Sequence, residues 1–60
     1  MKTYSSITYH GGLSDEMLIT FINQQASIGI NFISACHDGR YAFVLFFVSE
    51  NGKKVSNPNN

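Results

Sequence analysis

The chain has 60 residues, of which 13% are charged, and four Lys and Arg residues balance four Asp and Glu residues. A domain this small buries only roughly 60% of the surface that its unfolded chain exposes, so it usually needs a disulfide, a metal or oligomerisation. The single cysteine, Cys36, excludes an internal disulfide, and with His10 and His37 it has no recognisable zinc spacing. We therefore expect an oligomer without a cofactor. Because the chain has no net charge and no basic stripe, we expect no binding to duplex nucleic acid.

The start of the chain predicts no signal peptide, because no apolar stretch follows Lys2. The longest apolar run is also far shorter than the roughly 20 residues that cross a bilayer. We expect a cytoplasmic protein with no membrane contact, located in the host cytoplasm if the protein is viral.

Residues 2–10 are rich in Thr, Tyr and Ile, which favour strands. We expect an outer strand with one solvent-exposed face. Gly11-Gly12 ends this strand.

Residues 15–27 predict a helix. Ser14 suits the N-cap, the acidic residues after it suit the positive end of the helix dipole, and Gly29 suits the left-handed residue after the helix. The apolar arc of this helix is about 200° wide, and Gln25 lies near its middle. Gln25 either reaches water near the helix end or is a buried amide that needs a partner, across an oligomer seam or on a ligand.

Residues 30–48 predict a β-hairpin. Asp38-Gly39 lies between two apolar runs, as is typical of a two-residue turn, and this turn sets His37 opposite Arg40. A slip of one residue would exchange the faces of one strand, and neither arrangement has a polar face. The expected pairs are Cys36/Tyr41, Ser34/Phe43, Phe32/Leu45 and Ile30/Phe47 on one face, and Ala35/Ala42, Ile33/Val44 and Asn31/Phe46 on the other.

Asn51-Gly52 predicts a second turn, after which residues 53–56 could form a short fourth strand beside Val48. We expect residues 57–60 to be a disordered tail. The predicted fold is a single α+β domain over residues 1–56, in the order β-α-β-β, with one helix packed on a small, mainly antiparallel sheet.

The apolar run from Ala42 to Val48 makes both faces of its strand apolar. One helix covers one face, and we place it on the bulkier side with Phe32, Phe43, Leu45 and Phe47. Monomers rarely expose an apolar patch of several hundred Å². We therefore expect a second copy to cover the other face; its residues are Ile33, Ala35, Ala42, Val44 and Phe46. The alternatives are a monomer whose helix and first strand bury everything, and a constitutive partner protein.

Two groups of residues are candidates for ligand binding. His37, Arg40 and Tyr41 flank the predicted turn and combine a cation, an imidazole and a ring, which suits an anionic, nucleotide-like molecule. Tyr4, Tyr9 and His10 form a second, polar-aromatic group near the first strand, of which Tyr9 and His10 are the ligand-binding candidates. The plainer interpretation is an ordinary polar hairpin tip and tyrosines that pack.

No group of residues predicts catalysis. Cys36 has no base placed within reach, because His37 next to it points to the opposite face of the strand. We expect Cys36 to be a buried small residue. No pair of carboxylates has a spacing that suits acid–base work, so we expect no enzyme activity.

Residues 16–47 resemble a family of small uncharacterised bacterial and phage proteins with a β-α-β-β layout. Their helix runs into a Gly-aromatic-polar-apolar-apolar step and then a hairpin. Here Gly29-Ile30-Asn31-Phe32-Ile33 occupies that step, with Ile30 where the family usually has tryptophan. The resemblance implies the architecture and no activity.

The chain is also similar in kind to short, oligomeric phage accessory proteins, several of which sequester a signalling nucleotide or block a host defence protein. This likeness implies a non-enzymatic protein that sequesters a ligand or blocks a partner, with a phage-type anti-defence role by analogy. The alternative is a structural or adaptor subunit that docks its apolar sheet face on a larger protein.

Overall fold

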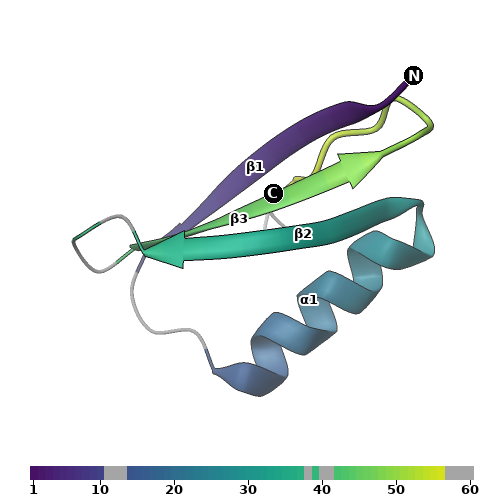
Figure 1. The fold of residues 1–60 in the computed structure, drawn as a ribbon. Coiled ribbons are helices and arrows are strands. Elements are labelled where there is room, and N and C mark those ends of the chain that lie inside the picture. Colours follow the sequence, from purple (N-terminus) through teal and green to yellow (C-terminus); the bar gives the residue numbers. More distant parts are fainter. Residues whose placement is uncertain (11–13, 38, 40–41, 57–60) are drawn as a thin grey trace.

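The computed structural model describes residues 1–10, 14–37, 39 and 42–56. Three strands form one antiparallel sheet in the order β1-β3-β2, and α1 lies against one face of it beside β2 (Figure 1). The predicted α+β fold in the order β-α-β-β is therefore confirmed. The elements are β1 (Thr3–His10), α1 (Asp15–Ser27), β2 (Ile30–His37) and β3 (Ala42–Ser49).

Helix α1 begins and ends at the predicted residues. The Ser14 hydroxyl accepts a hydrogen bond from the Met17 N–H at 3.2 Å, which satisfies one of the free donors of the first turn. Gly29 follows the helix with φ 85°, the left-handed conformation that glycine adopts without steric cost. The residues that mark both ends of the helix are thus visible in the local sequence.

The core lies between α1 and the side of the sheet that faces it. The Phe47 ring is completely buried and meets the rings of Phe21 and Phe32 edge-on, with centroids 5.8 Å and 5.6 Å away. The helix contributes a stripe at positions i, i+3, i+4 and i+7. The stripe consists of Leu18, Phe21, Ile22 and Gln25, and the other core residues are Ile30, Leu45 and Val55, with Ile7 and Tyr9 packed against them.

The predicted fourth strand is wrong. Residues 53–56 have no regular secondary structure, although Val55 is buried in the core. The Val55 N–H donates to the Ser5 hydroxyl at 3.1 Å, and the Ser49 hydroxyl donates to the Lys53 carbonyl at 2.6 Å. A strand beside Val48 is excluded because β3 is the central strand and already pairs with β1 and β2 on its two sides.

The predicted register of the hairpin is also wrong. His37 lies opposite Phe43, so residues 38–42 separate the paired positions, where a two-residue turn would have placed Arg40 opposite His37. The register shifts once more between Phe32 and Ser34, which leaves Ile33 without a partner, as in a β-bulge. A longer connection fixes the register less tightly, and the observed register buries Leu45 and Phe47 together against the helix. Asp38, Arg40 and Tyr41 lie outside the described residues.

The junction between α1 and β2 provides a first prediction. The Asn51 amide donates to the Ile28 carbonyl at 3.0 Å, and a Cβ on Gly29 would lie 2.5 Å from the Asn51 Nδ2 atom. Gly29→Ala should therefore cost the left-handed strain, about 1–2 kcal/mol, and should also displace the Asn51 cap. Gly52→Ala is the matched control, because Gly52 has φ 79° but nothing within 4 Å of its Cβ position.

We expect urea unfolding to show a larger loss of stability for Gly29→Ala than for Gly52→Ala. Equal losses would show that the contact between Gly29 and Asn51 contributes nothing.

Candidate functional site

One face of the sheet points away from α1. On β1, half-buried residues alternate with exposed ones, and the exposed set begins with Tyr4. Residues directly opposite one another on antiparallel strands share a face, so the register extends this set across β3 and β2. We call it the outward face; its residues are Tyr4, Ser6, Thr8, His10, Ala42, Val44, Phe46, Val48, Asn31, Ser34 and Cys36.

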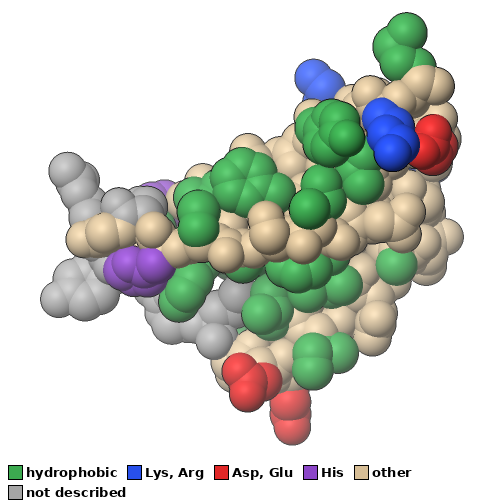
Figure 2. All heavy atoms as spheres, in the orientation of Figure 1, with side chains coloured by type: hydrophobic (Ala, Val, Ile, Leu, Met, Phe, Trp, Pro, Cys, Tyr) green, Lys and Arg blue, Asp and Glu red, His purple; other side chains and the backbone are tan. Residues whose placement is uncertain are grey.

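The outward face has no Lys, Arg, Asp or Glu among its strand residues. Tyr4 is 66% exposed and Phe46 is 38% exposed, while Val44 and Val48 are half-buried. Figure 2 shows charged side chains of the described residues at one end of the sheet and at the start of the helix. The middle of the sheet is thus left neutral and largely apolar.

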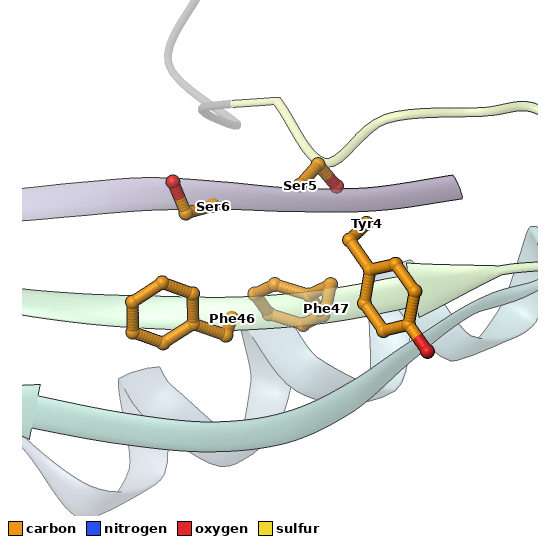
Figure 3. Close-up of a pocket in the computed structure, with 5 residues that line it drawn as sticks. All are labelled: Tyr4, Ser5, Ser6, Phe46 and Phe47. Carbon is orange, nitrogen blue, oxygen red and sulfur yellow. The ribbon is translucent and has the colours of Figure 1, made fainter. Parts of the chain in front are cut away.

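A hollow interrupts the outward face between the rings of Tyr4 and Phe46 (Figure 3). Its volume is about 240 Å³, it is open to solvent, and Ser6 lines it from β1, directly opposite Phe46. Ser5 and Phe47 complete the lining. The close-up views the sheet with the helix behind it, and the Tyr4 ring reaches from β1 across β3.

The residues predicted as an oligomer interface do not all lie on the outward face. Val44 and Phe46 do, since they pair with the exposed residues Thr8 and Ser6. Ala35 does not, because it lies opposite Leu45 on the helix side.

Two further predicted interface residues differ from the expectation in other ways. Ala42 shares the outward face by register but is only 2% exposed, so it offers almost no contact area. Ile33 is exposed and is the unpaired residue at the register shift. The predicted pairing of Ala35 with Ala42 is therefore wrong, because the longer hairpin connection moves the two strands past one another.

The strand order brings two of the predicted ligand-binding groups to one end of the sheet. Tyr9 at the end of β1 and His37 at the end of β2 both lie opposite Phe43 at the start of β3. They form one row across the three strands on the helix side, and Figure 2 shows the histidines at this end. His10 lies at the same end but on the outward face.

The imidazole of His37 has a defined orientation. Its ring meets the Phe43 ring edge-on with centroids 5.1 Å apart, and its Nδ1 atom accepts from the Gly39 N–H at 3.2 Å. Since Nδ1 accepts, a neutral His37 carries its proton on Nε2, which can donate to an acceptor at the end of the sheet.

Tyr9 is mainly a packing residue. Its ring meets the Phe21 ring edge-on at a centroid distance of 5.5 Å, and burial raises the pKa of the Tyr9 phenol above its ordinary value. This environment agrees with the plainer of the two sequence interpretations. Arg40 and Tyr41, the other predicted ligand-binding residues, lie outside the described part of the chain.

The prediction that Cys36 is buried is wrong: the thiol is exposed on the outward face, opposite Val44. The cause is that β2 is an edge strand, and the register shift turns its second half over relative to β3. His10 shares this face, but β3 lies between them and they are offset by two residues along it, so they are about 12 Å apart by strand spacing and rise. No hydrogen-bonded Cys–His pair can form at that separation within one chain.

Within the described ranges, no group of three or more His, Cys, Asp or Glu side chains could hold a metal ion. No described helix is long and apolar enough to cross a membrane.

Gln25 is a buried amide, which decides between the two alternatives that the sequence left open. It is 7% exposed, and its Oε1 atom has no hydrogen-bond partner among the described residues. It points toward the sheet one turn after Phe21, on the opposite side from the outward face. A second copy that packs on the outward face would therefore not contact Gln25. In such an oligomer the Gln25 amide cannot find its partner across the interface.

The sequence did not reveal the hollow beside Tyr4 and Ser6. These residues meet Phe46 only through the pairing of β1 with β3, and β1 and β3 are far apart in the chain. The one local signal was a small residue, Ser6, two positions from a large ring on the same strand face.

Comparison of the chain with protein-family models, with curated proteins and with solved structures found no match.

Proposed function

We propose that this protein is a non-enzymatic binding protein that works as a homo-oligomer and contacts its second copy through the outward face. The observation that carries the proposal is the uncharged outward face, on which the Phe46 ring of the central strand and the Tyr4 ring near the start of β1 are exposed. An exposed apolar patch with polar residues around it is the kind of surface that marks a protein–protein contact site.

The size of the outward face sets the expected affinity. Three strands of eight residues span about 14 Å by 26 Å from the ordinary strand spacing and rise. Two such faces bury less than the roughly 1,200–2,000 Å² of a standard interface. Because association costs at least about 4 kcal/mol in lost freedom, we expect a dissociation constant in the micromolar range.

The ligand in this proposal is an anionic, nucleotide-like small molecule that binds at the hairpin end of the sheet. Two features support this class: His37 can donate from Nε2, and Phe43 offers a partly exposed ring beside it. His10 adds a second imidazole at the same end. Interference with host defence signalling stays a prediction from the likeness to phage accessory proteins.

Native mass spectrometry of the freshly purified protein tests this proposal. We expect complexes at a multiple of the 6.7 kDa chain mass. An added mass of a few hundred daltons per site would identify a captured small ligand.

A monomer at all concentrations would contradict self-association. If that monomer then binds a larger protein through the outward face, the adaptor function replaces the one proposed here.

A further inference from the structure

The side chain of Asn51 joins parts of the chain that meet at the end of the sheet where α1 runs into β2 (Figure 1). Its Nδ2 atom donates to the Ile28 carbonyl at 3.0 Å, at the junction between α1 and β2. Its Oδ1 atom accepts from the Lys53 N–H at 3.0 Å, in the segment that leads to buried Val55. We call this pair of hydrogen bonds the Asn51 clamp.

Asn51 is also the only asparagine in the sequence that is followed by glycine. Glycine has no side chain to shield its backbone nitrogen, so this nitrogen approaches the Asn51 amide carbon with little hindrance. Both residues are exposed, and no atom beyond the chain neighbours of Gly52 lies within 4 Å of its Cβ position, so water reaches the pair. The pair therefore meets the chemical requirements for spontaneous deamidation.

Deamidation at this pair needs no reactant other than water. The Gly52 nitrogen attacks the Asn51 Cγ atom, the bond between Cγ and Nδ2 breaks, and ammonia leaves with the proton of the Gly52 N–H. Water then opens the resulting cyclic imide at either of its two carbonyls. The product at position 51 is aspartate or isoaspartate, and in isoaspartate the main chain passes through the Cβ and Cγ atoms.

The Asn51 clamp opposes this reaction in the folded chain, and the reaction removes the clamp. Attack on Cγ requires the amide to rotate and its Nδ2 atom to depart, and both movements break the observed hydrogen bonds. A carboxylate at position 51 has no N–H and places negative charge beside the Ile28 carbonyl oxygen, so the bond to Ile28 cannot form again. Each opening of the clamp thus admits a step that closing does not reverse.

We propose that Asn51-Gly52 is a modification site at which spontaneous deamidation, admitted by opening of the Asn51 clamp, permanently releases the turn after β3 from the junction of α1 and β2. The chain then loses stability with age, because the same turn anchors the segment that carries Val55 into the core. This inference is independent of the proposed binding function and of the outward face.

Peptide mapping by mass spectrometry during incubation at neutral pH tests the site. We expect the folded chain to gain mass at Asn51, through replacement of the amide by a carboxylic acid, and not at Asn23 or Asn31. The chain in urea should react about ten to one hundred times faster, because two hydrogen bonds no longer hold the amide. Equal rates in the two states would overturn the role of the clamp. A folded chain that is unmodified at Asn51 after one hundred half-lives of the unfolded chain would overturn the site.

Ser49→Ala separates the effect of the clamp from the chemistry of the pair. The Ser49 hydroxyl donates to the Lys53 carbonyl at 2.6 Å and holds the same turn, while its substitution leaves the reacting pair unchanged. This variant should deamidate faster than the wild type when folded and at the wild-type rate in urea. If it does not fold, Ser5→Ala replaces it, because the Ser5 hydroxyl accepts from the Val55 N–H. A folded variant that reacts no faster than the wild type would overturn the role of the clamp.

Asn51→Asp reproduces the aspartate product and tests its consequence. The variant keeps an oxygen that can accept from the Lys53 N–H but lacks the donor to the Ile28 carbonyl. We expect it to unfold at a lower urea concentration than the wild type, and the aged wild-type chain should shift in the same direction. Asn23→Asp is the charge-matched control, since Asn23 is exposed on α1, and it should shift the midpoint less. Equal shifts for the two variants would overturn the claim that deamidation acts through loss of the Asn51 clamp.

Discussion

Phe47→Ala is expected to remove a large part of the free energy of unfolding of this domain, about 3–5 kcal/mol. The Phe47 ring is fully buried and contacts the rings of Phe21 and Phe32. Truncation of a buried phenylalanine costs about 3–5 kcal/mol in lost transfer energy and cavity formation. A 60-residue domain has only about 3–9 kcal/mol of stability at the usual 0.05–0.15 kcal/mol per residue. Circular dichroism with urea titration measures the loss directly.

Phe46→Ala is the matched control for this prediction. Phe46 is the preceding residue of β3, but its side chain is on the outward face and 38% exposed. The diluted single chain should therefore lose no more than about 1–1.5 kcal/mol from this substitution. Equal destabilisation by Phe46→Ala and Phe47→Ala would contradict the assignment of one residue to the core and the other to the outward face.

Phe46→Lys is expected to abolish self-association, with a dissociation constant raised at least 100-fold. The substitution places one ammonium group from each copy in the contact between the outward faces, where burial without a partner is costly and the like charges repel each other. Sedimentation velocity at several concentrations measures the change. Circular dichroism confirms that the variant is folded.

Ile19→Lys controls for the general effect of removing an exposed apolar side chain and adding a charge. Ile19 is exposed on α1, away from the outward face, and a lysine there lies four residues after Asp15, a spacing that supports helices. This variant should associate like the wild type. If Ile19→Lys dissociates the oligomer and Phe46→Lys does not, the helix and not the sheet is the contact surface.

If the oligomer persists in both Phe46→Lys and Ile19→Lys, we expect the contact between copies to lie at the edge of β2. This strand has eight residues, INFISACH, with no formal charge at neutral pH and no proline, and its outer edge pairs with no described strand. Edge strands of this kind readily pair with another chain. Pairing there would extend the sheet without covering the outward face.

The sequence predicted the elements of this fold better than their pairing. The ends of α1 followed from Ser14 and Gly29, because caps act through neighbouring backbone groups that the local sequence determines. The hairpin register did not follow from Asp38-Gly39. The two-residue turn would have set it, but the observed register depends on the burial of Leu45 and Phe47 by the helix.

The other two errors follow from the position of β3 in the centre of the sheet, in the case of Cys36 together with the register shift in β2. With β1 and β2 on its two sides, β3 has no free edge for the predicted fourth strand. The segment that places Val55 in the core is instead bonded through the hydroxyl groups of Ser5 and Ser49. The same order leaves β2 at an edge, which exposes Cys36. Strand order depends on long-range contacts, and these are not encoded in the local pattern of any segment.

The outward face, too, was predicted from the sequence only in part. The apolar run of β3 correctly predicted that both faces of this strand are apolar, and it placed Val44 and Phe46 on the face that the helix leaves open. The hollow beside Phe46 depends on Tyr4 and Ser6 of β1, and only the observed pairing of β1 with β3 brings them together.

An isotope-filtered NOE experiment on an equimolar mixture of labelled and unlabelled chains tests the central claim most directly. It detects only contacts between copies. We predict cross-peaks from the Phe46 ring protons of one copy to residues of the outward face of the other. Cross-peaks between copies that involve α1 or the β2 edge but not Phe46, or no such cross-peaks at millimolar concentration, would contradict the claim that a second copy covers the outward face.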